Sequence, residues 1–96
     1  MSAYVIVDVE IHDPLRYQEY MSKVALALEK AGGKYLARGG DLKVYEGDWK
    51  PHRIVLFEFP SMEAWDKFYN SPTYHRIKAI RDECSTARLI CVDGIK

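Results

Sequence analysis

Three arginines are the side chains of this sequence best suited to hold a negatively charged molecule. Arg38 and Arg53 lie in or next to predicted strands, and Arg81 lies on a predicted helix. A guanidinium group can bind a carboxylate through two parallel hydrogen bonds. Arg81 shares a helical stripe with Tyr74 and Ile77, which points it toward the interior of the protein. We therefore predict that the arginines bind an anionic ligand; the alternative is that they pair with nearby carboxylates and stabilise loops and a dimer.

Two glutamates and two histidines are the candidates for moving a proton. Glu46 and Glu58 would act as a general acid or base if burial raised the pKa of either carboxyl group, and the alternative is plain ion pairing. His75 and His52 are the imidazoles best placed to shuttle a proton. We predict Glu58 and His75 as the catalytic groups and Glu46 as a member of the ligand-binding set.

Tyr74 completes the predicted ligand-binding set. Its phenol could donate a hydrogen bond to a bound carbonyl, although such a residue can also be an aromatic anchor with its hydroxyl at the rim of the core. The histidines and cysteines do not show the spacing of metal ligands, so no metal site and no cofactor are predicted.

Composition limits the class of protein. The chain of 96 residues is predicted to form one domain, residues 1–96. Its formal net charge of zero argues against a nucleic-acid partner, because phosphate binding usually needs a basic excess. The apolar runs are far shorter than a membrane span requires. Two cysteines without a disulfide or metal pattern predict a reduced, cytoplasmic protein.

The hydrophobic pattern predicts an α+β fold. Apolar residues alternate along 4–11, as in a strand, and recur at helical spacing after the Asp13-Pro14 start signal. Pro72 is predicted to break the second helical region. The predicted strands and extended segments are 4–11, 34–38, 42–46, 53–59 and 86–92, with helices between 14 and 31 and between 61 and 84. This βαββαβ order predicts a ferredoxin-like fold, a four-stranded antiparallel sheet with the helices on one face.

The prediction about assembly rests on the second face of this sheet, which the helices do not cover. Residues 53–59 are apolar on both faces, yet the helices can cover only one. The uncovered face would hold Ile6, Leu56, Asp8 and Glu58, with residues of strand 34–38. A second copy packed sheet to sheet would shelter it, so we predict a homodimer. A small-molecule pocket is predicted between this face and the partner subunit.

Four ordered segments resemble a known family. They are "YLARGG" (35–40), "YEGDWKPHR" (45–53), "FEFPSMEAW" (57–65) and "YNSPTYHRIKAIR" (69–81), and with the first strand they span nearly the whole chain. The chain resembles the domain-of-unknown-function family 1330 of the dimeric α+β barrel superfamily. The resemblance implies the fold, a dimer and no established activity. The polar residues that it matches are Arg38, Glu46, Arg53, Glu58, Tyr74 and Arg81.

Two functions remain open from the sequence. The first is a small-molecule binding protein or a cofactor-free enzyme that acts on a small anionic or carbonyl-bearing metabolite. The second is a non-catalytic dimeric domain whose polar residues serve assembly. The wider superfamily includes cofactor-free monooxygenases, lactone isomerases and haem-binding enzymes, so the fold does not select among them. His75 as an axial haem ligand rests on that analogy alone.

Overall fold

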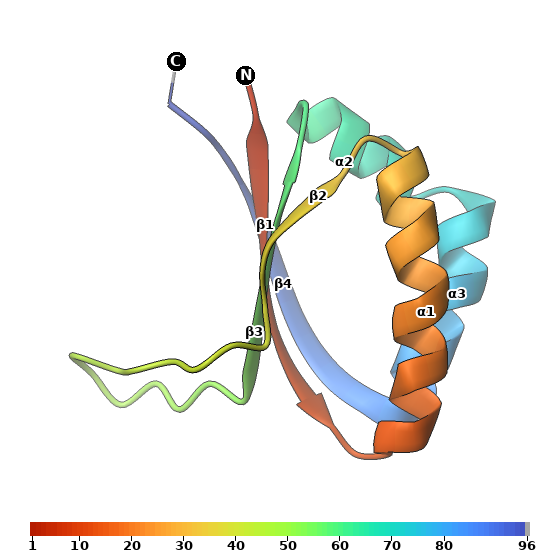
Figure 1. Ribbon diagram of the computed structural model, residues 1–96. Coiled ribbons are helices and arrows are strands. Elements are labelled where there is room, and N and C mark those ends of the chain that lie inside the picture. The colour runs from red at the N-terminus through yellow and green to blue at the C-terminus, as the bar shows by residue number, and fades with distance from the viewer. Residues whose placement is uncertain (96) are drawn as a thin grey trace.

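The computed structural model describes residues 1–95 and shows one antiparallel sheet with its helices on one face (Figure 1). The strand order is β2-β3-β1-β4, so the predicted ferredoxin-like βαββαβ arrangement is confirmed. The elements are β1 (Ala3–Ile11), α1 (Pro14–Lys30), β2 (Lys34–Arg38), β3 (Arg53–Phe59), α2 (Met62–Tyr69), α3 (Pro72–Cys84) and β4 (Ser85–Asp93). No helix in this part of the chain is long and apolar enough to cross a membrane.

Local capping chemistry sets the helix boundaries. The Asp13 carboxylate accepts a hydrogen bond from the backbone N–H of Arg16 at the start of α1. The Ser71 hydroxyl accepts one from the backbone N–H of Tyr74 at the start of α3. Each helix has proline at its first position, where a missing N–H costs no intrahelical bond. The predicted break between α2 and α3 is therefore confirmed.

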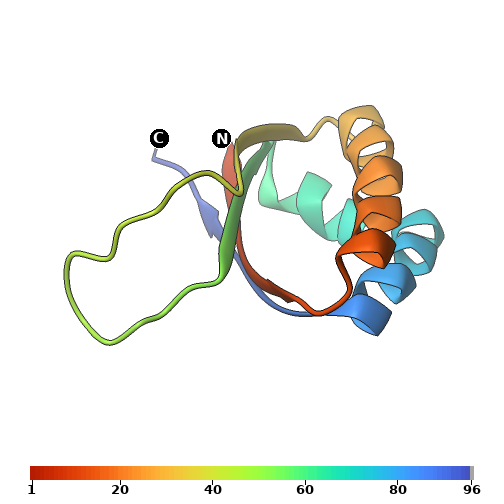
Figure 2. The same ribbon diagram turned by 60° about the horizontal axis from the view of Figure 1, so that its bottom comes forward.

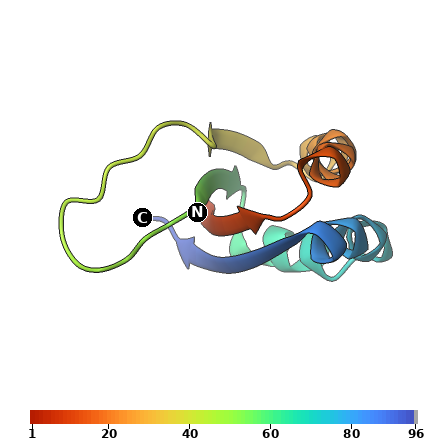
Figure 3. The ribbon, with the colours of Figure 1, turned by 90° about the horizontal axis from the view of Figure 1, so that it is seen from below.

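The core lies between the sheet and the helices. Alternate residues of β1 and β3 point into it and are buried, as the alternation predicted, namely Val5, Val7, Val9, Val55, Phe57 and Phe59. In Figure 3, α1 lies over the β2 side of the sheet, whereas α2 and α3 lie over the β4 side. The helix α1 and the pair α2 and α3 thus form one layer above the sheet. The aromatic side chains of the core lie between this layer and the sheet.

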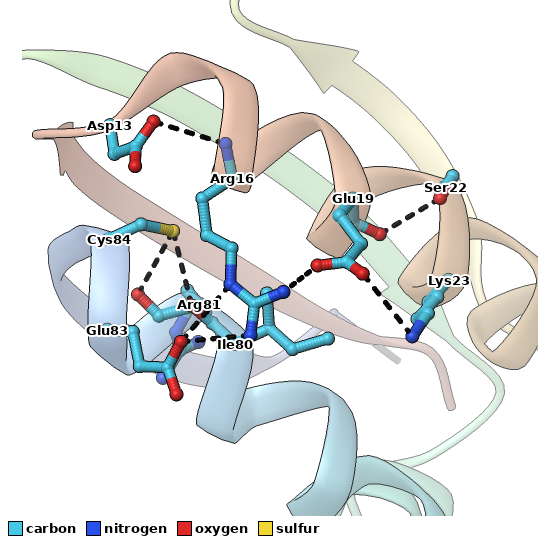
Figure 4. A network of polar contacts seen from close by, with 9 residues as sticks. All are labelled: Asp13, Arg16, Glu19, Ser22, Lys23, Ile80, Arg81, Glu83 and Cys84. Atoms are coloured by element: carbon cyan, nitrogen blue, oxygen red, sulfur yellow. Dashed lines mark hydrogen bonds and ion pairs between the residues drawn. The ribbon is translucent and has the colours of Figure 1, made fainter.

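An ion-pair network ties α1 to α3 near the end of the helix that carries Arg81 (Figure 4). Arg16 on α1 donates to the Glu83 carboxylate from both Nε, at 3.1 Å, and Nη2, at 2.9 Å. Arg16 also contacts Glu19 on its own helix. The pairs are partly exposed, so we assign them a role in helix alignment rather than a large part in stability.

The outer sheet face carries an aliphatic row that no helix covers. The cross-strand register places Ile6 beside Leu56 on one neighbouring strand and beside Ile90 on the other. This aliphatic row crosses three strands, and Ile90 exposes 64% of its surface. The face therefore has the composition that the sequence predicted for a surface that meets another molecule.

Residues 39–52 differ from the prediction. The sequence indicated extended structure at 42–46, but the chain between Arg38 and Arg53 forms neither strand nor helix and projects from the sheet on the side opposite the helices (Figures 1 and 2). A strand needs a neighbour for its backbone hydrogen bonds, and no other strand lies beside this segment. The β-propensity of residues 42–46 was therefore overridden by the lack of a pairing partner.

Candidate functional site

A cavity lies between the inner sheet face and the helices. Its enclosed volume of about 30 Å³ is the space of about two water molecules. Three arginines, four tyrosines and several large apolar residues line it, among them Arg38, Arg53, Arg81, Tyr17, Tyr20, Tyr35, Tyr74, Phe57, Trp65 and Phe68. No aspartate, glutamate or histidine is among the lining residues of the described chain. The walls are thus cationic and aromatic.

This location corrects the sequence analysis. The pocket was expected on the outer face, between the sheet and a partner subunit, yet Arg38, Arg53, Tyr74 and Arg81 line a cavity under the helices. The outer face has a separate open hollow beside Asp8. Among the residues described, the proton-shuttle candidate His52 lines this hollow, but none of the predicted catalytic or ligand-binding residues does. The sequence showed which side chains point inward on α3 but not that a strand irregularity turns Arg38 to the same side.

Arg81 is the most deeply placed cation. Only 5% of its surface is exposed. Its Nη1 donates to the Tyr74 hydroxyl at 3.1 Å, and that hydroxyl lies 3.2 Å from the hydroxyl of Tyr20. Its Nη2 lies 3.7 Å from the largely exposed Asp82 carboxylate, and its Nε has no hydrogen-bond partner within residues 1–95. Arg81 is therefore a buried cation with an incomplete set of partners.

The electrostatic environment keeps Arg81 charged. Burial by itself lowers the pKa of the guanidinium, but Tyr74, Tyr20 and the Asp82 carboxylate outweigh that effect and raise the pKa above its ordinary value. The cavity consequently holds a fixed positive charge at neutral pH.

Arg53 brings a second guanidinium to the same cavity from the start of β3. Its Nη2 has only a 3.9 Å contact to the Met21 sulfur, and its Nε is buried without a partner in the described chain. The guanidinium passes directly over Gly39, where an added Cβ would lie 2.3 Å from Nη1. Gly39 also has a positive φ of 71°, which a side chain would strain. The glycine thus makes the space that Arg53 occupies.

Replacement of Gly39 by alanine is expected to displace Arg53 and to destabilise the fold by about 1–2 kcal/mol, since both the steric overlap and the left-handed backbone oppose a Cβ. Urea unfolding would measure this loss. Gly40→Ala is the matched control, because nothing lies within 4 Å of its added Cβ. Equal stability of the two variants would contradict the steric role of Gly39.

A β-bulge places Arg38 at the cavity. Tyr35 pairs with Phe57, but the register then shifts, so Ala37 pairs with Leu56 and Arg38 pairs with Val55. The extra residue breaks the simple alternation of β2 and turns both Tyr35 and Arg38 to the inner face. The Arg38 guanidinium lies 4.6 Å from the centre of the Tyr35 ring. Arg38 itself is exposed, so it stands at the mouth of the cavity.

Tyr20 is the functional candidate that the sequence analysis missed. It is buried on α1 and joins Arg81 and Tyr74 in one chain of hydrogen bonds. Burial, together with the neighbouring Tyr74 hydroxyl, raises the pKa of Tyr20 far above its ordinary value. Its phenol is therefore a neutral hydrogen-bond donor at physiological pH. Its position four residues before Val24 on the buried stripe was the signal that could have found it.

Alkaline titration is expected to reveal these buried phenols. Burial raises the pKa of Tyr17, Tyr20 and Tyr35, whereas unfolded tyrosine ionises near pH 10. Their contribution to stability is thus fully present below about pH 10 and falls above it by up to about 1.4 kcal/mol per pH unit for each group. Unfolding free energies measured from pH 8 to 11 should fall less steeply for Tyr20→Phe than for wild type.

The exposed Tyr45 supplies the control for this experiment. Its side chain is 86% exposed, so Tyr45→Phe should follow the wild-type pH profile. A Tyr20→Phe profile with the wild-type slope would show that Tyr20 ionises normally in the folded protein.

The other predicted residues lie away from the cavity. Glu58 lies on the outer side of β3, where it pairs across the sheet with Tyr4 and Lys34. Glu46 is exposed in the 39–52 segment, and His75 is exposed on α3. The structure therefore does not bring Glu46, Glu58 or His75 together with the arginines. In residues 1–95, no three His, Cys, Asp or Glu side chains cluster closely enough to share a metal ion.

Solved structures of other proteins share this fold. A protein of unknown function from Rhodopseudomonas palustris matches with a TM-score of 0.76 and 18% identity, covering 99% of this chain and 83% of that one. A dimeric ferredoxin-like protein of unknown function from Jannaschia sp. CCS1 matches with a TM-score of 0.70 and 17% identity, over 98% and 100% of the two chains. SnoaB, a cofactor-independent oxygenase from Streptomyces nogalater, matches with a TM-score of 0.70 and 10% identity, over 99% and 94%.

Sequence comparison identifies the family but no characterised relative. No curated protein sequence matches this chain. The family model described as a domain of unknown function, DUF1330, matches residues 2–95. The fold is that of the dimeric α+β barrel proteins, as the resemblance implied, and the chain belongs to the DUF1330 family.

Proposed function

We propose that this protein binds a small anionic or carbonyl-bearing metabolite in the cavity between sheet and helices. The observation that carries the proposal is the charge of the walls: Arg38, Arg53 and Arg81 line the cavity, and no carboxylate of residues 1–95 does. The Nε atoms of Arg53 and Arg81 are buried and lack partners within residues 1–95. A buried, incompletely paired cation costs several kcal/mol, and a bound anion would offset that cost.

The tyrosines fit the same role. Tyr20 and Tyr74 form a hydrogen-bonded pair that ends on Arg81, and the high pKa of Tyr20 keeps its proton in place as a donor. Neutral phenols next to a guanidinium stabilise negative charge on oxygen, such as a carboxylate or an enolate. The cavity is thus suited to hold an oxyanion.

If the protein also catalyses a reaction on the bound metabolite, we propose that it does so without a cofactor. SnoaB, which shares the fold, is a cofactor-independent oxygenase. Among the residues that the structure describes, no Asp, Glu or His lines the cavity and could remove a proton there. Any reaction here would therefore act on a substrate that is already ionised or that ionises readily beside Arg81. Glu58 and His75 have no part in this proposal, because neither lines the cavity.

A thermal-shift screen of small metabolites tests the binding proposal. Anions should raise the melting temperature of the wild-type protein, by on the order of 10 °C at about 100 times Kd, and cations of similar size should not. Arg81→Ala should abolish the shift, whereas Arg76→Ala, on the exposed side of the same helix, should keep it. The proposal fails if no anion or carbonyl compound stabilises the wild type.

We also propose that two copies of the chain form a homodimer through their outer sheet faces. The aliphatic row of Ile6, Leu56 and Ile90 lies opposite the helices, and the Jannaschia neighbour is described as dimeric. In such a dimer each protomer would keep its own cavity, because the cavity lies on the other side of the sheet.

A non-catalytic dimeric domain is the second candidate. The small cavity volume favours it, since ligand sites commonly span about 300–1,000 Å³. Under this hypothesis Arg38→Ala or Arg81→Ala would mainly weaken the dimer or lower its melting temperature. Under the first proposal the same variants remain dimeric and lose ligand binding.

A further inference from the structure

The unsatisfied hydrogen-bond donors of Arg53 and Arg81 lie on the same edge of each guanidinium. Nε and Nη2 together form the side edge of an arginine, which presents two parallel N–H groups. In both residues Nε is buried without a partner in the described chain. The Nη2 atom has only a long contact in each residue. In Arg53 it lies 3.9 Å from the Met21 sulfur, and in Arg81 it lies 3.7 Å from an Asp82 oxygen. Each arginine therefore lines the cavity and has one side edge whose hydrogen bonds are incomplete.

The shape of this edge favours a planar, two-oxygen anion. Two parallel N–H groups match the two oxygens of a carboxylate, whereas a tetrahedral phosphate would bring further oxygens that need further donors. The cavity has room for about two water molecules, which two carboxylate oxygens can replace. The remaining donors nearby are the phenols of Tyr20 and Tyr74, one of which is already bonded to Arg81.

The body of such a ligand would lie at the mouth of the cavity. Leu28, Tyr35 and Arg38 line both the cavity and an adjoining open hollow of about 320 Å³ between α1 and β2. Arg38 already lies over the Tyr35 ring at 4.6 Å, so a flat ring can take the same kind of contact with this guanidinium. The mouth thus combines an aromatic wall, an aliphatic wall and a movable cation.

We propose that the ligand is a planar aromatic carboxylate, held by the side edges of Arg53 and Arg81, with its ring at the mouth between Leu28, Tyr35 and Arg38. This inference rests on the proposed function and narrows it to one ligand class. Arg53 and Arg81 are binding residues, and Arg38 closes over the ring.

Calorimetric titration of the full chain with four probes tests the ligand class. Benzoate has the ring and the carboxylate, benzamide has the ring without the charge, acetate has the carboxylate without the ring, and inorganic phosphate has the charge in a tetrahedral form. Benzoate should bind at least about tenfold more tightly than each of the other three. Preferential binding of phosphate, benzamide or acetate would overturn the aromatic carboxylate while leaving the proposed function in place. If none of the probes binds and the metabolite screen also fails, both proposals fall.

Arginine-to-lysine variants test the side-edge geometry, because lysine keeps the charge but has no planar edge. Arg81→Lys and Arg53→Lys should each weaken benzoate binding at least about tenfold. Arg76→Lys, at an exposed position of α3, should bind benzoate as the wild type does. Arg53 is less buried than Arg81, so its variant remains informative if Arg81→Lys does not fold. Unchanged affinity in Arg53→Lys would overturn the bidentate arrangement.

Discussion

Replacing Arg81 by methionine is expected to leave the unliganded protein at least as stable as the wild type while abolishing anion binding. Methionine has a similar length and no charge, so the variant removes a guanidinium that is 5% exposed and incompletely paired. Replacing a whole buried ion pair by apolar residues is often neutral or stabilising by about 1–4 kcal/mol. The same reasoning applies to Arg81 because its carboxylate neighbour, Asp82, is largely exposed and would not be left as a buried charge. The Tyr74 hydroxyl keeps Tyr20 as its hydrogen-bond partner. Urea unfolding and ligand titration would measure the two effects on the same sample.

Arg76→Met is the matched control for this prediction. Arg76 lies on the exposed side of α3, so its removal should change neither anion binding nor stability by more than about 0.5 kcal/mol. If Arg81→Met lowered the free energy of unfolding by more than about 2 kcal/mol, Arg81 would serve the fold, because the arginine would then stabilise the structure more than an apolar side chain does. Gain of stability with loss of binding is the combination expected of a residue retained for function.

Replacing Ile90 by lysine is expected to convert a dimer into monomers. Ile90 lies beside Ile6 in the aliphatic row of the outer face, and 64% of its surface is free in the single chain. A two-fold interface would bury two such lysines without partners, which should raise the dimer dissociation constant at least about a hundredfold. Light scattering coupled to size exclusion should give twice the chain mass of 11.1 kDa for the wild type and the chain mass for the variant.

Leu26 provides the control for the dimer. It is 63% exposed on α1, on the helical side of the sheet, so Leu26→Lys should remain dimeric. A wild-type protein that runs as an 11.1 kDa particle in dilute solution would refute the assembly through the outer face. That result would leave the cavity proposal standing, because the cavity lies within one protomer.

Local sequence signals were sufficient to predict the helices and strands and the wall of the site that α3 provides. Asp13-Pro14 and Ser71-Pro72 start helices because side-chain caps and proline act within a few residues. The stripe of Tyr74, Ile77 and Arg81 faces inward because helical periodicity depends only on spacing. The predicted inward direction of Arg81 is confirmed for the same reason.

The rest of the site depends on contacts between segments far apart in the chain. The bulge of β2 is a property of its pairing with β3, and it alone turns Arg38 to the side of Tyr35. Arg53 reaches the cavity because Gly39, just after the neighbouring strand β2, has no side chain to block it. The Tyr20 hydroxyl joins the hydrogen bonds of the site only when α1 packs beside α3.

The sequence by itself determined the order of the elements, the two apolar sheet faces and the inward position of Arg81, because these follow from periodicity and capping over a few residues. Only the tertiary structure decided that Arg38 and Arg53 join Arg81 under the helices and that Glu46 and His75 stay outside the cavity. Arg38 faces the cavity because one extra residue in β2 reverses the face of the side chains that follow it, and a sequence does not show where pairing will slip.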